Sequence, residues 1–465
     1  MSLIRSIVLA AWCLVAAIAH AEPPAADQPD IRAAAAAVQA QELRSTIERL
    51  VGFGTRHTLS DTKSDTRGIG AARRWAQSRF EAISKACNAC LEVVMPSQVV
   101  TGPRVPNPTD VVDVVAIQRG SDDPRRVILI TGHIDSRVSD IMNFTSDAPG
   151  ANDDASGVSA LLEAARVLSK HKFAATIVYS ADSGEEQGLS GGKVIAQYAV
   201  DHGWKVEANL NNDIVGSPNG GDGQRDPNSV RVFSEGTRTN ETPEQADYRR
   251  YHGGEVDSPS RNIARFMQSL AERHLGDFRV RMVYRTDRYG RGGDQVEFLA
   301  QGFPAVRVTE SHEDYTHQHQ DLRTENGVRY GDTIEHVDFD YLANVTRLDA
   351  ITLAALANAP APPDGIEMKG EVDYDTTLSW QPVPGATAYR AWWRDTTAPQ
   401  WQHARDADAA MSIVLKGINI DDWFFGVSAV SSDGWESPVV FPGAPGQWAK
   451  GEPAKAETPK AAAPK

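Results

Sequence analysis

The stretch VILITGHIDSRVSDIMNFTSDAPGANDDASG, residues 127–157, contains the first signs of both the fold and the chemistry. It begins with an unbroken apolar run from Val127 to Ile130, and the lack of alternation predicts a strand buried on both faces of a sheet. His133 and Asp135 follow just past the predicted strand, where open α/β sheets place their ligand sites. The His-x-Asp spacing lets the carboxylate hold one imidazole nitrogen, an arrangement common around protein metal ions.

A turn of small and acidic residues closes this stretch. It contains Asp153 and Asp154, and Ser156 is predicted to cap a helix whose apolar residues recur at helical spacing. Either motif alone has an ordinary structural explanation: loop histidines commonly pair with nearby carboxylates, and acidic residues before a helix offset its dipole. The case for chemistry therefore depends on the rest of the chain.

More polar groups follow later predicted strands. Glu185 and Glu186 stand in SGEEQG, Asp213 stands in NDIVG, and the segment YTHQHQD carries His317 and His319. Adjacent side chains of an extended chain point apart, so one glutamate of the pair can bind a metal while the other faces a water molecule. Two imidazoles and three carboxylates would hold two divalent ions, each with a private carboxylate and one shared between them.

The order of these motifs resembles the zinc aminopeptidases of peptidase family M28. That family has His-x-Asp, Gly-Ala-x-Asp-Asp-x-Ser-Gly, Glu-Glu-x-Gly, Asp-x-x-Gly and a final histidine, and all five occur here in order between Glu42 and Leu356. The resemblance implies a mixed, mostly parallel sheet between helices, a peptide or small-protein substrate and two zinc ions per chain. The implied ligands are His133 and Asp213 for one zinc, Glu186 and His317 for the other, and Asp153 as the bridge.

The resemblance also assigns supporting roles. Glu185 becomes the general base that activates the attacking water. Asp135 orients His133 without binding the metal itself. His317 is preferred over His319 as the last ligand because Asp321 then lies at the common His-to-Asp spacing; His319 is the alternative. Two features depart from the family or stay open. Gly293-Asp294-Gln295 stands where a histidine often follows the aspartate, and Tyr289 is a weak candidate for oxyanion stabilisation.

The start of the chain predicts export. Residues 1–21 have one basic residue, an apolar run and a small-x-small ending, which is typical of a cleaved secretory signal and too short for a membrane span. A periplasmic or extracellular location favours a local disulfide between Cys87 and Cys90. The formal net charge of −15 argues against nucleic acid as a partner. The oligomeric state cannot be read from the sequence.

Composition divides the remaining chain into parts. Residues 30–358 alternate predicted strands and helices, 359–364 form a Pro-rich linker, 365–447 carry short strands resembling a fibronectin type III β-sandwich, and 448–465 are predicted to be a disordered tail. All chemical motifs precede the linker. The sequence therefore predicts that a chain ending near Pro360 keeps its metal and much of its turnover on small substrates.

The spacing of apolar residues predicts the secondary structure. The helices are expected at 31–51, 67–84, after Gly157, at 263–271 and at 338–357, and the strands at 91–95, 111–117, 127–131, 175–180, 278–284 and 303–309.

Several functions fit this pattern. The preferred one is a secreted or periplasmic dizinc exopeptidase, most simply an aminopeptidase. A peptidase of the M20 type or a carboxypeptidase uses similar ligands, but M20 enzymes usually insert a dimerisation domain between the fourth and fifth motifs. Glutaminyl cyclases share the fold but lose the first histidine, whereas this chain retains it as His133. A non-catalytic adhesion protein on a peptidase scaffold would be expected to have lost ligands, and none is missing here.

Overall fold

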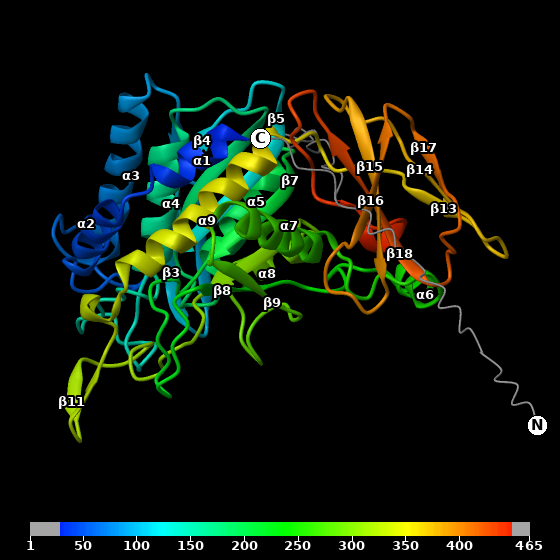
Figure 1. Ribbon diagram of the computed structural model, residues 1–465. Helices are drawn as coiled ribbons and strands as arrows, with labels where there is room; N and C mark the ends of the chain where they lie inside the picture. Colours follow the sequence, from blue (N-terminus) through cyan, green and yellow to red (C-terminus); the bar gives the residue numbers. More distant parts are fainter. Residues whose placement is uncertain (1–27, 449–465) are drawn as a thin grey trace, which may run out of the picture.

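The computed structural model describes residues 28–448, and its centre is an eight-stranded sheet (Figure 1). In spatial order, the strands are β1 (Glu92–Val94), β4 (Val114–Gln118), β6 (Ala175–Asp182), β5 (Asp123–His133), β7 (Lys205–Asn212), β10 (Ala305–Thr309), β8 (Ser229–Phe233) and β9 (Arg279–Val283).

The sheet is mixed and mainly parallel at its centre. β5 pairs in parallel with both β6 and β7, and β10 pairs in parallel with β7. The antiparallel pairs are β1 with β4, β4 with β6, and β8 with β10. The prediction of a mixed, mostly parallel sheet is confirmed. The carboxyl ends of β5, β6, β7 and β10 therefore meet along one edge.

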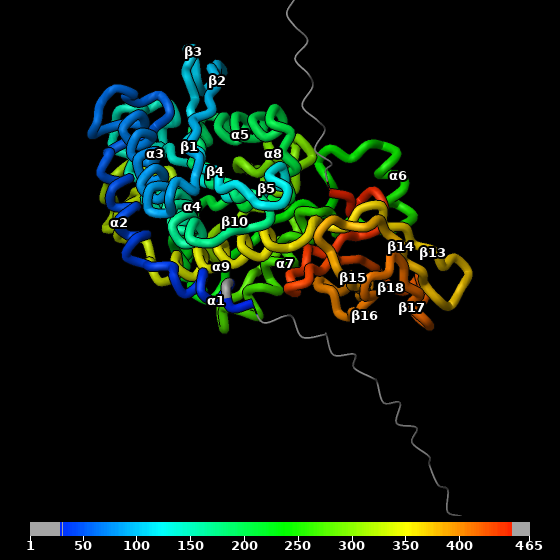
Figure 2. Tube along the Cα trace, turned by 90° about the horizontal axis from the view of Figure 1, so that it is seen from above, coloured from blue at the N-terminus to red at the C-terminus, as the bar shows by residue number. Residues whose placement is uncertain are grey.

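Helices cover both faces of this sheet (Figures 1 and 2). Ile128 and Ile130 of β5 pack into one apolar core, whereas Val127 and Leu129 pack into the other, as the unbroken apolar run predicted. The first face is covered mainly by helices α4, α7 and α9, and the second by α5 and α8. Their bounds are α4 (Ala155–Leu168), α5 (Ser190–Asp201), α7 (Pro259–His274), α8 (Gln295–Ala300) and α9 (Phe339–Asn358).

The amino-terminal helices differ from the predicted single helix. The segment forms α1 (Pro29–Ala36) and α2 (Ala40–Val51), followed by α3 (Gly68–Ala86). Gln39 between the first two is extended, and its N–H donates to Oε1 of Glu163 on α4 (2.7 Å). This contact turns the chain, so one amphipathic pattern becomes two helices.

The strand predicted at 111–117 is also divided. β3 (Val105–Val112) forms a hairpin with β2 (Ser97–Gly102) that stands out from the molecule (Figure 2). Asp113, which is buried, separates β3 from β4 and accepts a hydrogen bond from the Ser183 N–H (2.8 Å). The apolar pattern gave no sign of this change of direction.

The carboxyl-terminal part consists of two three-stranded antiparallel sheets. Trp380 and Tyr389 are buried in its core, as expected, and the Tyr389 hydroxyl accepts the Val383 N–H (2.7 Å). The fibronectin type III resemblance remains a prediction. The strands of the two sheets are β13 (Glu367–Lys369), β14 (Thr376–Ser379) and β17 (Ser412–Leu415), and β16 (His403–Asp408), β15 (Ala388–Asp395) and β18 (Trp423–Val430).

A buried ion cluster joins the two parts of the molecule. Asp257, which precedes α7, accepts hydrogen bonds from Nη1 of Arg265 on α7 (2.8 Å). Both of its carboxylate oxygens also accept from Nη2 of Arg394 on β15, each at 2.8 Å. All three residues are at most 2% exposed. The β-sandwich is therefore attached through fully desolvated charges as well as through the linker.

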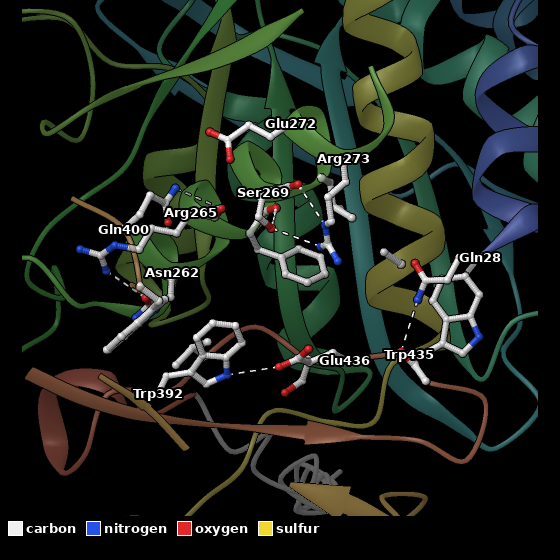
Figure 3. Close-up of a pocket in the computed structure, with 17 residues that line it drawn as sticks. Gln28, Asn262, Arg265, Ser269, Glu272, Arg273, Trp392, Gln400, Trp435 and Glu436 are labelled. Carbon is white, nitrogen blue, oxygen red and sulfur yellow. Dashed lines mark hydrogen bonds between the residues drawn. The ribbon is translucent and has the colours of Figure 1, made fainter. Parts of the chain in front are cut away.

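A pocket of 140 Å³ lies beside this cluster, between α7 and the β-sandwich (Figure 3). Its walls include Trp392 and Trp435 from the sandwich and Arg273 from α7. The Trp392 indole N–H donates to Glu436 (3.2 Å). None of the predicted metal ligands lines this pocket.

The two ends of the β-sandwich are held to the larger domain. Ala359, the first linker residue, accepts a hydrogen bond from Nη2 of Arg126 (2.9 Å). Trp448 was predicted to begin a disordered tail, and this is wrong: its indole is 9% exposed and donates to the Glu207 carbonyl of β7 (2.9 Å). Burial of the indole fixes this residue. The remaining tail, 449–465, and the predicted signal, 1–21, lie outside the described residues.

Two other expectations concern the chain's environment. Cys87 and Cys90 form a disulfide in the structure. Within residues 28–448, no helix combines the length and the apolar character that crossing a membrane requires.

Candidate metal centre

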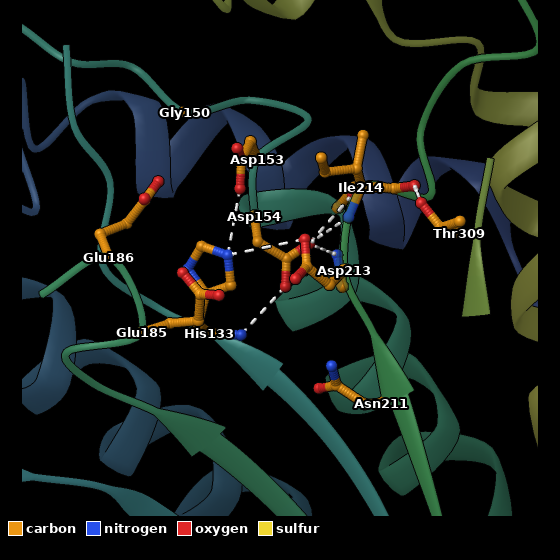
Figure 4. Close-up of polar contacts among 12 residues, drawn as sticks. His133, Gly150, Asp153, Asp154, Glu185, Glu186, Asn211, Asp213, Ile214 and Thr309 are labelled. Carbon is orange, nitrogen blue, oxygen red and sulfur yellow. Dashed lines mark hydrogen bonds and ion pairs between the residues drawn. The ribbon is translucent and has the colours of Figure 1, made fainter. Parts of the chain in front are cut away.

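Most of the predicted site residues meet at the carboxyl edge of the sheet (Figure 4). His133 is the last residue of β5, and Asp213 follows β7 directly. Glu185 and Glu186 lie in the turn after β6, and Asp153 lies just before α4. Parallel strands and one connecting loop thus bring together groups that are up to 80 residues apart in sequence.

Two triads of possible ligand atoms share one carboxylate. In the first, Nε2 of His133 lies 3.0 Å from Oδ1 of Asp153 and 3.8 Å from Oδ1 of Asp213. In the second, Nε2 of His319 lies 2.9 Å from Oδ2 of Asp153 and 3.0 Å from Oε1 of Glu186. The ligand atoms within each triad are all within 4.8 Å of one another. Asp153 directs one oxygen to each triad, as a bridging ligand does.

The last histidine of the cluster is His319, and the preference for His317 is corrected. The His317 ring stacks on His336 with ring centroids 3.4 Å apart, and its Nδ1 lies 3.5 Å from Asp314. His319 has a left-handed backbone conformation (φ 56°), which turns its side chain toward Asp153. Sequence spacing could not reveal this backbone reversal.

Asp321 was expected to support the last ligand, and the structure places it elsewhere. Its carboxylate is exposed and accepts a hydrogen bond from the Ser139 hydroxyl (2.7 Å). It therefore connects two surface loops.

Asp135 supports the site more broadly than predicted. Its Oδ1 lies 3.6 Å from Nδ1 of His133, whose shorter contact is with the Asp135 carbonyl (3.2 Å). The Asp135 carboxylate also accepts the N–H groups of Glu185 and Glu186, both at 3.2 Å, and the Thr58 hydroxyl (3.0 Å). One buried carboxylate thus orders the turn that presents both glutamates.

Asp154 has the capping role that was predicted for Ser156. One oxygen of Asp154 accepts the Gly157 N–H (2.9 Å), and the other accepts the His133 N–H (2.9 Å). The Ser156 hydroxyl donates instead to the Asn152 carbonyl (2.6 Å). Asp154 belongs to neither triad and joins the start of α4 to the end of β5.

Glu185 lies at the cluster without being part of either triad. Burial raises the pKa of its carboxyl well above the usual value; the nearby His133 lowers it and Glu186 raises it. A carboxylate whose proton affinity is increased in this way is suited to accept a proton from water and release it again. The position and the environment of Glu185 therefore fit a general base.

The residues present fit bound zinc. Oε1 of Glu186 is buried without a hydrogen-bond partner, although it is directed at the second triad. Burial alone would lower the pKa of His319, but Glu186 and Asp153 outweigh it and raise the pKa to about 10. Each triad offers one imidazole nitrogen and two carboxylate oxygens, which are donors that zinc binds.

Arg56 is a supporting residue that the sequence did not indicate. Its guanidinium, fully buried, donates to the carbonyls of Ile134 (2.7 Å), Pro149 (2.5 Å) and Gly150 (2.9 Å). These carbonyls flank the segments that carry His133 and Asp153. Arg56 therefore fixes the spacing of the two loops, and nothing in its sequence neighbourhood is distinctive.

Two more arginines, Arg137 and Arg307, contact the carboxylates of the triads and were also missed. A signal existed for Arg307, because it interrupts the otherwise apolar strand β10 and is nevertheless fully buried. A buried arginine requires an anionic or carbonyl partner. A partner for Arg307 was therefore to be expected on a neighbouring strand or at its end.

The remaining candidates contribute less. Tyr289 is 87% exposed. Asp294 is buried at the start of α8, where it accepts the Gly192 N–H (3.2 Å). Gln295, which replaces the family's frequent histidine, accepts from Asn211 (2.9 Å). It thus connects α8 to β7.

This fold and this pair of triads fit a metal-dependent peptidase. Residues 113–327 match the model of peptidase family M28. A probable zinc metalloprotease of Pyrenophora tritici-repentis is 43% identical over 427 residues, which are 90% of this chain and 88% of the relative. Another, from Leptosphaeria maculans, is 43% identical over 422 residues, covering 90% and 97%. The chain belongs to peptidase family M28.

Solved structures agree on the fold. The crystal structure of LapB from Legionella pneumophila superposes with a TM-score of 0.52 and 19% identity, covering 72% of this chain and 76% of that one. The LapA aminopeptidase of the same organism gives 0.51 and 18%, covering 77% and 80%. At this identity the likeness concerns the fold alone.

Proposed function

We propose that the protein is an exported dizinc exopeptidase that removes residues from the amino-terminal end of peptides. The observation that carries this proposal is the pair of triads sharing Asp153, with Glu185 beside them. Membership of the M28 family makes the protein a zinc metallopeptidase; the number of ions, the cleaved end and the location are the proposed parts.

Each group has a role in this proposal. His133 and Asp213 would hold one zinc, Glu186 and His319 the other, and Asp153 both. Bound zinc supplies a Lewis acid that polarises the scissile carbonyl and makes water acidic. Glu185 takes the proton from the attacking water and returns it to the leaving amine.

The surroundings of the site favour a chain end as substrate. The β2–β3 hairpin is attached beside the cluster, because Nη1 of Arg104 donates to the Glu186 carbonyl (3.1 Å). A second hairpin, β11 (Arg323–Glu325) with β12 (Val328–Tyr330), follows His319 and also projects from the molecule (Figure 1). Projections on both flanks of the cluster suit the end of a peptide better than its middle.

The architecture disfavours an enzyme of the M20 type. Between Asp213 and His319 the chain contributes β8, β9 and β10, all of which belong to the central sheet. That interval therefore contains no separate sheet domain of the kind expected for M20 enzymes. Retention of His133 and Asp213 likewise argues against a glutaminyl cyclase, and retention of every ligand argues against a non-catalytic scaffold.

Export is supported by two features. The first 21 residues have the pattern of a cleaved secretory signal, and the Cys87–Cys90 disulfide suits an oxidising compartment. Detection of mature protein beginning near Glu22 in the medium or periplasm would test this part.

The cleaved end can be determined with a mixture of synthetic peptides of varied sequence. Each peptide is supplied free, amino-acetylated or carboxyl-amidated, and the products are followed by mass spectrometry. We expect stepwise loss from the amino end of the free and amidated peptides and no cleavage of the acetylated ones. The Glu185→Gln protein is the matched control for contaminating peptidases. Trimming from the carboxyl end, or internal cleavage, would contradict the aminopeptidase assignment.

A further inference from the structure

Two arginines bind the carboxylates of the metal triads in the same way, although they come from different elements. Arg307 lies on β10, and Arg137 lies in the loop after β5. Each contacts the carboxylate that belongs to only one triad, Asp213 or Glu186. Neither is one of the ligand candidates that the sequence motifs supplied.

Arg307 binds Asp213 at two points. Its Nη1 forms an ion pair with Oδ2 of Asp213, and its Nη2 donates to the Asp213 carbonyl (3.2 Å). The other carboxylate oxygen, Oδ1, is the atom that faces His133. In the sheet, Arg307 of β10 is paired with Asn211 of β7. Its side chain extends along β7 and reaches Asp213, the residue that follows this strand. Arg307 is fully buried.

Arg137 binds Glu186 in the corresponding manner. Its Nε donates to Oε2 of Glu186 (2.8 Å), whereas Oε1 faces His319 and has no hydrogen-bond partner. Its Nη2 contacts Nδ1 of His319 (2.6 Å), and its Nη1 donates to the Val138 carbonyl (3.1 Å). One guanidinium therefore connects a carboxylate, an imidazole and its own loop.

The charges explain why both arginines are needed. Asp153, Asp213 and Glu186 place three carboxylates in a small buried volume, where like charges repel strongly. Two guanidiniums offset two of these charges by binding the carboxylate oxygens that do not face the triad histidines. The carboxylates can then stay close together with one oxygen of each left free.

We propose that Arg137 and Arg307 are positioning residues that hold Glu186 and Asp213 as one-oxygen ligands. Each arginine occupies one carboxylate oxygen and thereby directs the other toward the metal. The pair also keeps the site assembled without metal, so removal of the ions leaves the fold intact. This inference rests on the proposed dizinc site, but it concerns residues outside the ligand set.

The test compares metal binding in Arg137→Met and Arg307→Met with that in the wild type. Methionine retains much of the apolar stem and removes the guanidinium. Arg261→Met is the matched control: Arg261 is 1% exposed, but its Nε donates to the Ser234 hydroxyl (2.7 Å), away from both triads. The readouts are zinc affinity by competition with a chromophoric chelator, the visible spectrum of the cobalt-substituted protein, and thermal unfolding.

We expect each site variant to lose about tenfold to hundredfold in zinc affinity, the usual effect of removing a partner that orients a metal ligand. The cobalt spectrum should change, since the free carboxylate can then bind through both oxygens. Arg261→Met should change only the unfolding temperature. Arg137→Lys and Arg307→Lys should keep part of the affinity, because lysine supplies the positive charge but not the planar set of N–H donors of a guanidinium.

The outcomes separate this inference from the proposed function. If the wild type binds zinc and both site variants bind it with unchanged affinity and spectrum, the arginines are merely structural and the inference is wrong. If the wild type binds no zinc, the proposed function itself fails. If Arg307→Met does not fold, the inference is tested with Arg137→Met alone. The Arg137 side chain is 16% exposed, so its replacement disturbs the buried packing less than that of the fully buried Arg307.

Discussion

Two clusters of buried charge can be compared within this molecule. At the domain interface, the single carboxylate of Asp257 is bound by the guanidiniums of Arg265 and Arg394, so positive charge is in excess. At the strand ends, three carboxylates of the triads face two guanidiniums, Glu185 adds a fourth acid, and the buried Oε1 of Glu186 faces His319 without a hydrogen-bond partner. In the first cluster both oxygens of the carboxylate are bound by protein groups, and the unpartnered atom is a donor, Nε of Arg394. The second has an excess of carboxylates with free oxygens, which is the charge pattern that a bound cation would offset.

The largest expected effect comes from removing the β-sandwich. A chain ending near Pro360 retains every ligand but loses Arg394 and Trp448, leaving Asp257 and Arg265 at a newly exposed apolar surface. The expectation from the sequence, that such a chain keeps its metal and much of its turnover on small substrates, is therefore revised. We expect low solubility and a much lower unfolding temperature, measured by circular dichroism. A soluble truncation with the stability of the full chain would show that the interface cluster contributes little.

A single substitution at the interface should have a smaller effect of the same kind. Arg394→Met removes hydrogen bonds to the buried Asp257, which keeps Arg265 as its partner, and should cost about 2–3 kcal/mol of unfolding free energy. Urea unfolding measures the loss, and zinc content should not change. Arg119→Met, which removes a half-exposed pair with Glu92, is the control and should cost at most about 1 kcal/mol. Loss of zinc from Arg394→Met would mean that the two clusters are not independent.

The adjacent glutamates should separate catalysis from metal binding. Glu185→Gln removes no metal bond, so zinc content should remain near that of the wild type while turnover falls about a hundredfold or more. Glu186→Gln should instead lower zinc content. Single-substrate kinetics and elemental analysis on both variants measure this. A Glu185→Gln enzyme with nearly normal turnover, or one that has lost zinc, would reverse the two roles.

The two histidines after β10 give the smallest and sharpest contrast. His319→Ala removes an imidazole of the second triad and should leave about one zinc per chain, one ligand set having lost its nitrogen donor. His317→Ala removes only the stack on His336 and should keep both ions. Elemental analysis of both proteins decides. Equal zinc content in the two variants would contradict the assignment of His319, rather than His317, as the metal ligand.

The fold and most of the site could be predicted from sequence for a physical reason. The unbroken apolar run of β5 and the helical spacing after Gly157 are local patterns, and strand ends collect ligands at one edge. The choice of His319 over His317, and the roles of Arg56 and Arg137, could not be predicted in the same way. Their roles depend on a left-handed backbone and on contacts with distant carbonyls and carboxylates, which leave no periodic signal.

The interface escaped prediction for a related reason. The Pro-rich segment beginning at Ala359 suggested a spacer between independent parts. Asp257 and Arg394 are 137 residues apart and carry no motif, so their pairing appears only when both domains are in place. The linker composition predicts a boundary, but composition does not reveal how firmly the two sides are joined.

The most direct test of this account is the zinc content of the full-length protein. Elemental analysis after gel filtration in metal-free buffer should give about two zinc ions per chain, since two triads share one bridging carboxylate. Treatment with a chelator should remove the zinc and the peptidase activity together, and added zinc should restore both. A protein that contains almost no zinc, or that hydrolyses peptides equally well after complete chelation, would contradict the claim that the strand-end cluster is a metal centre.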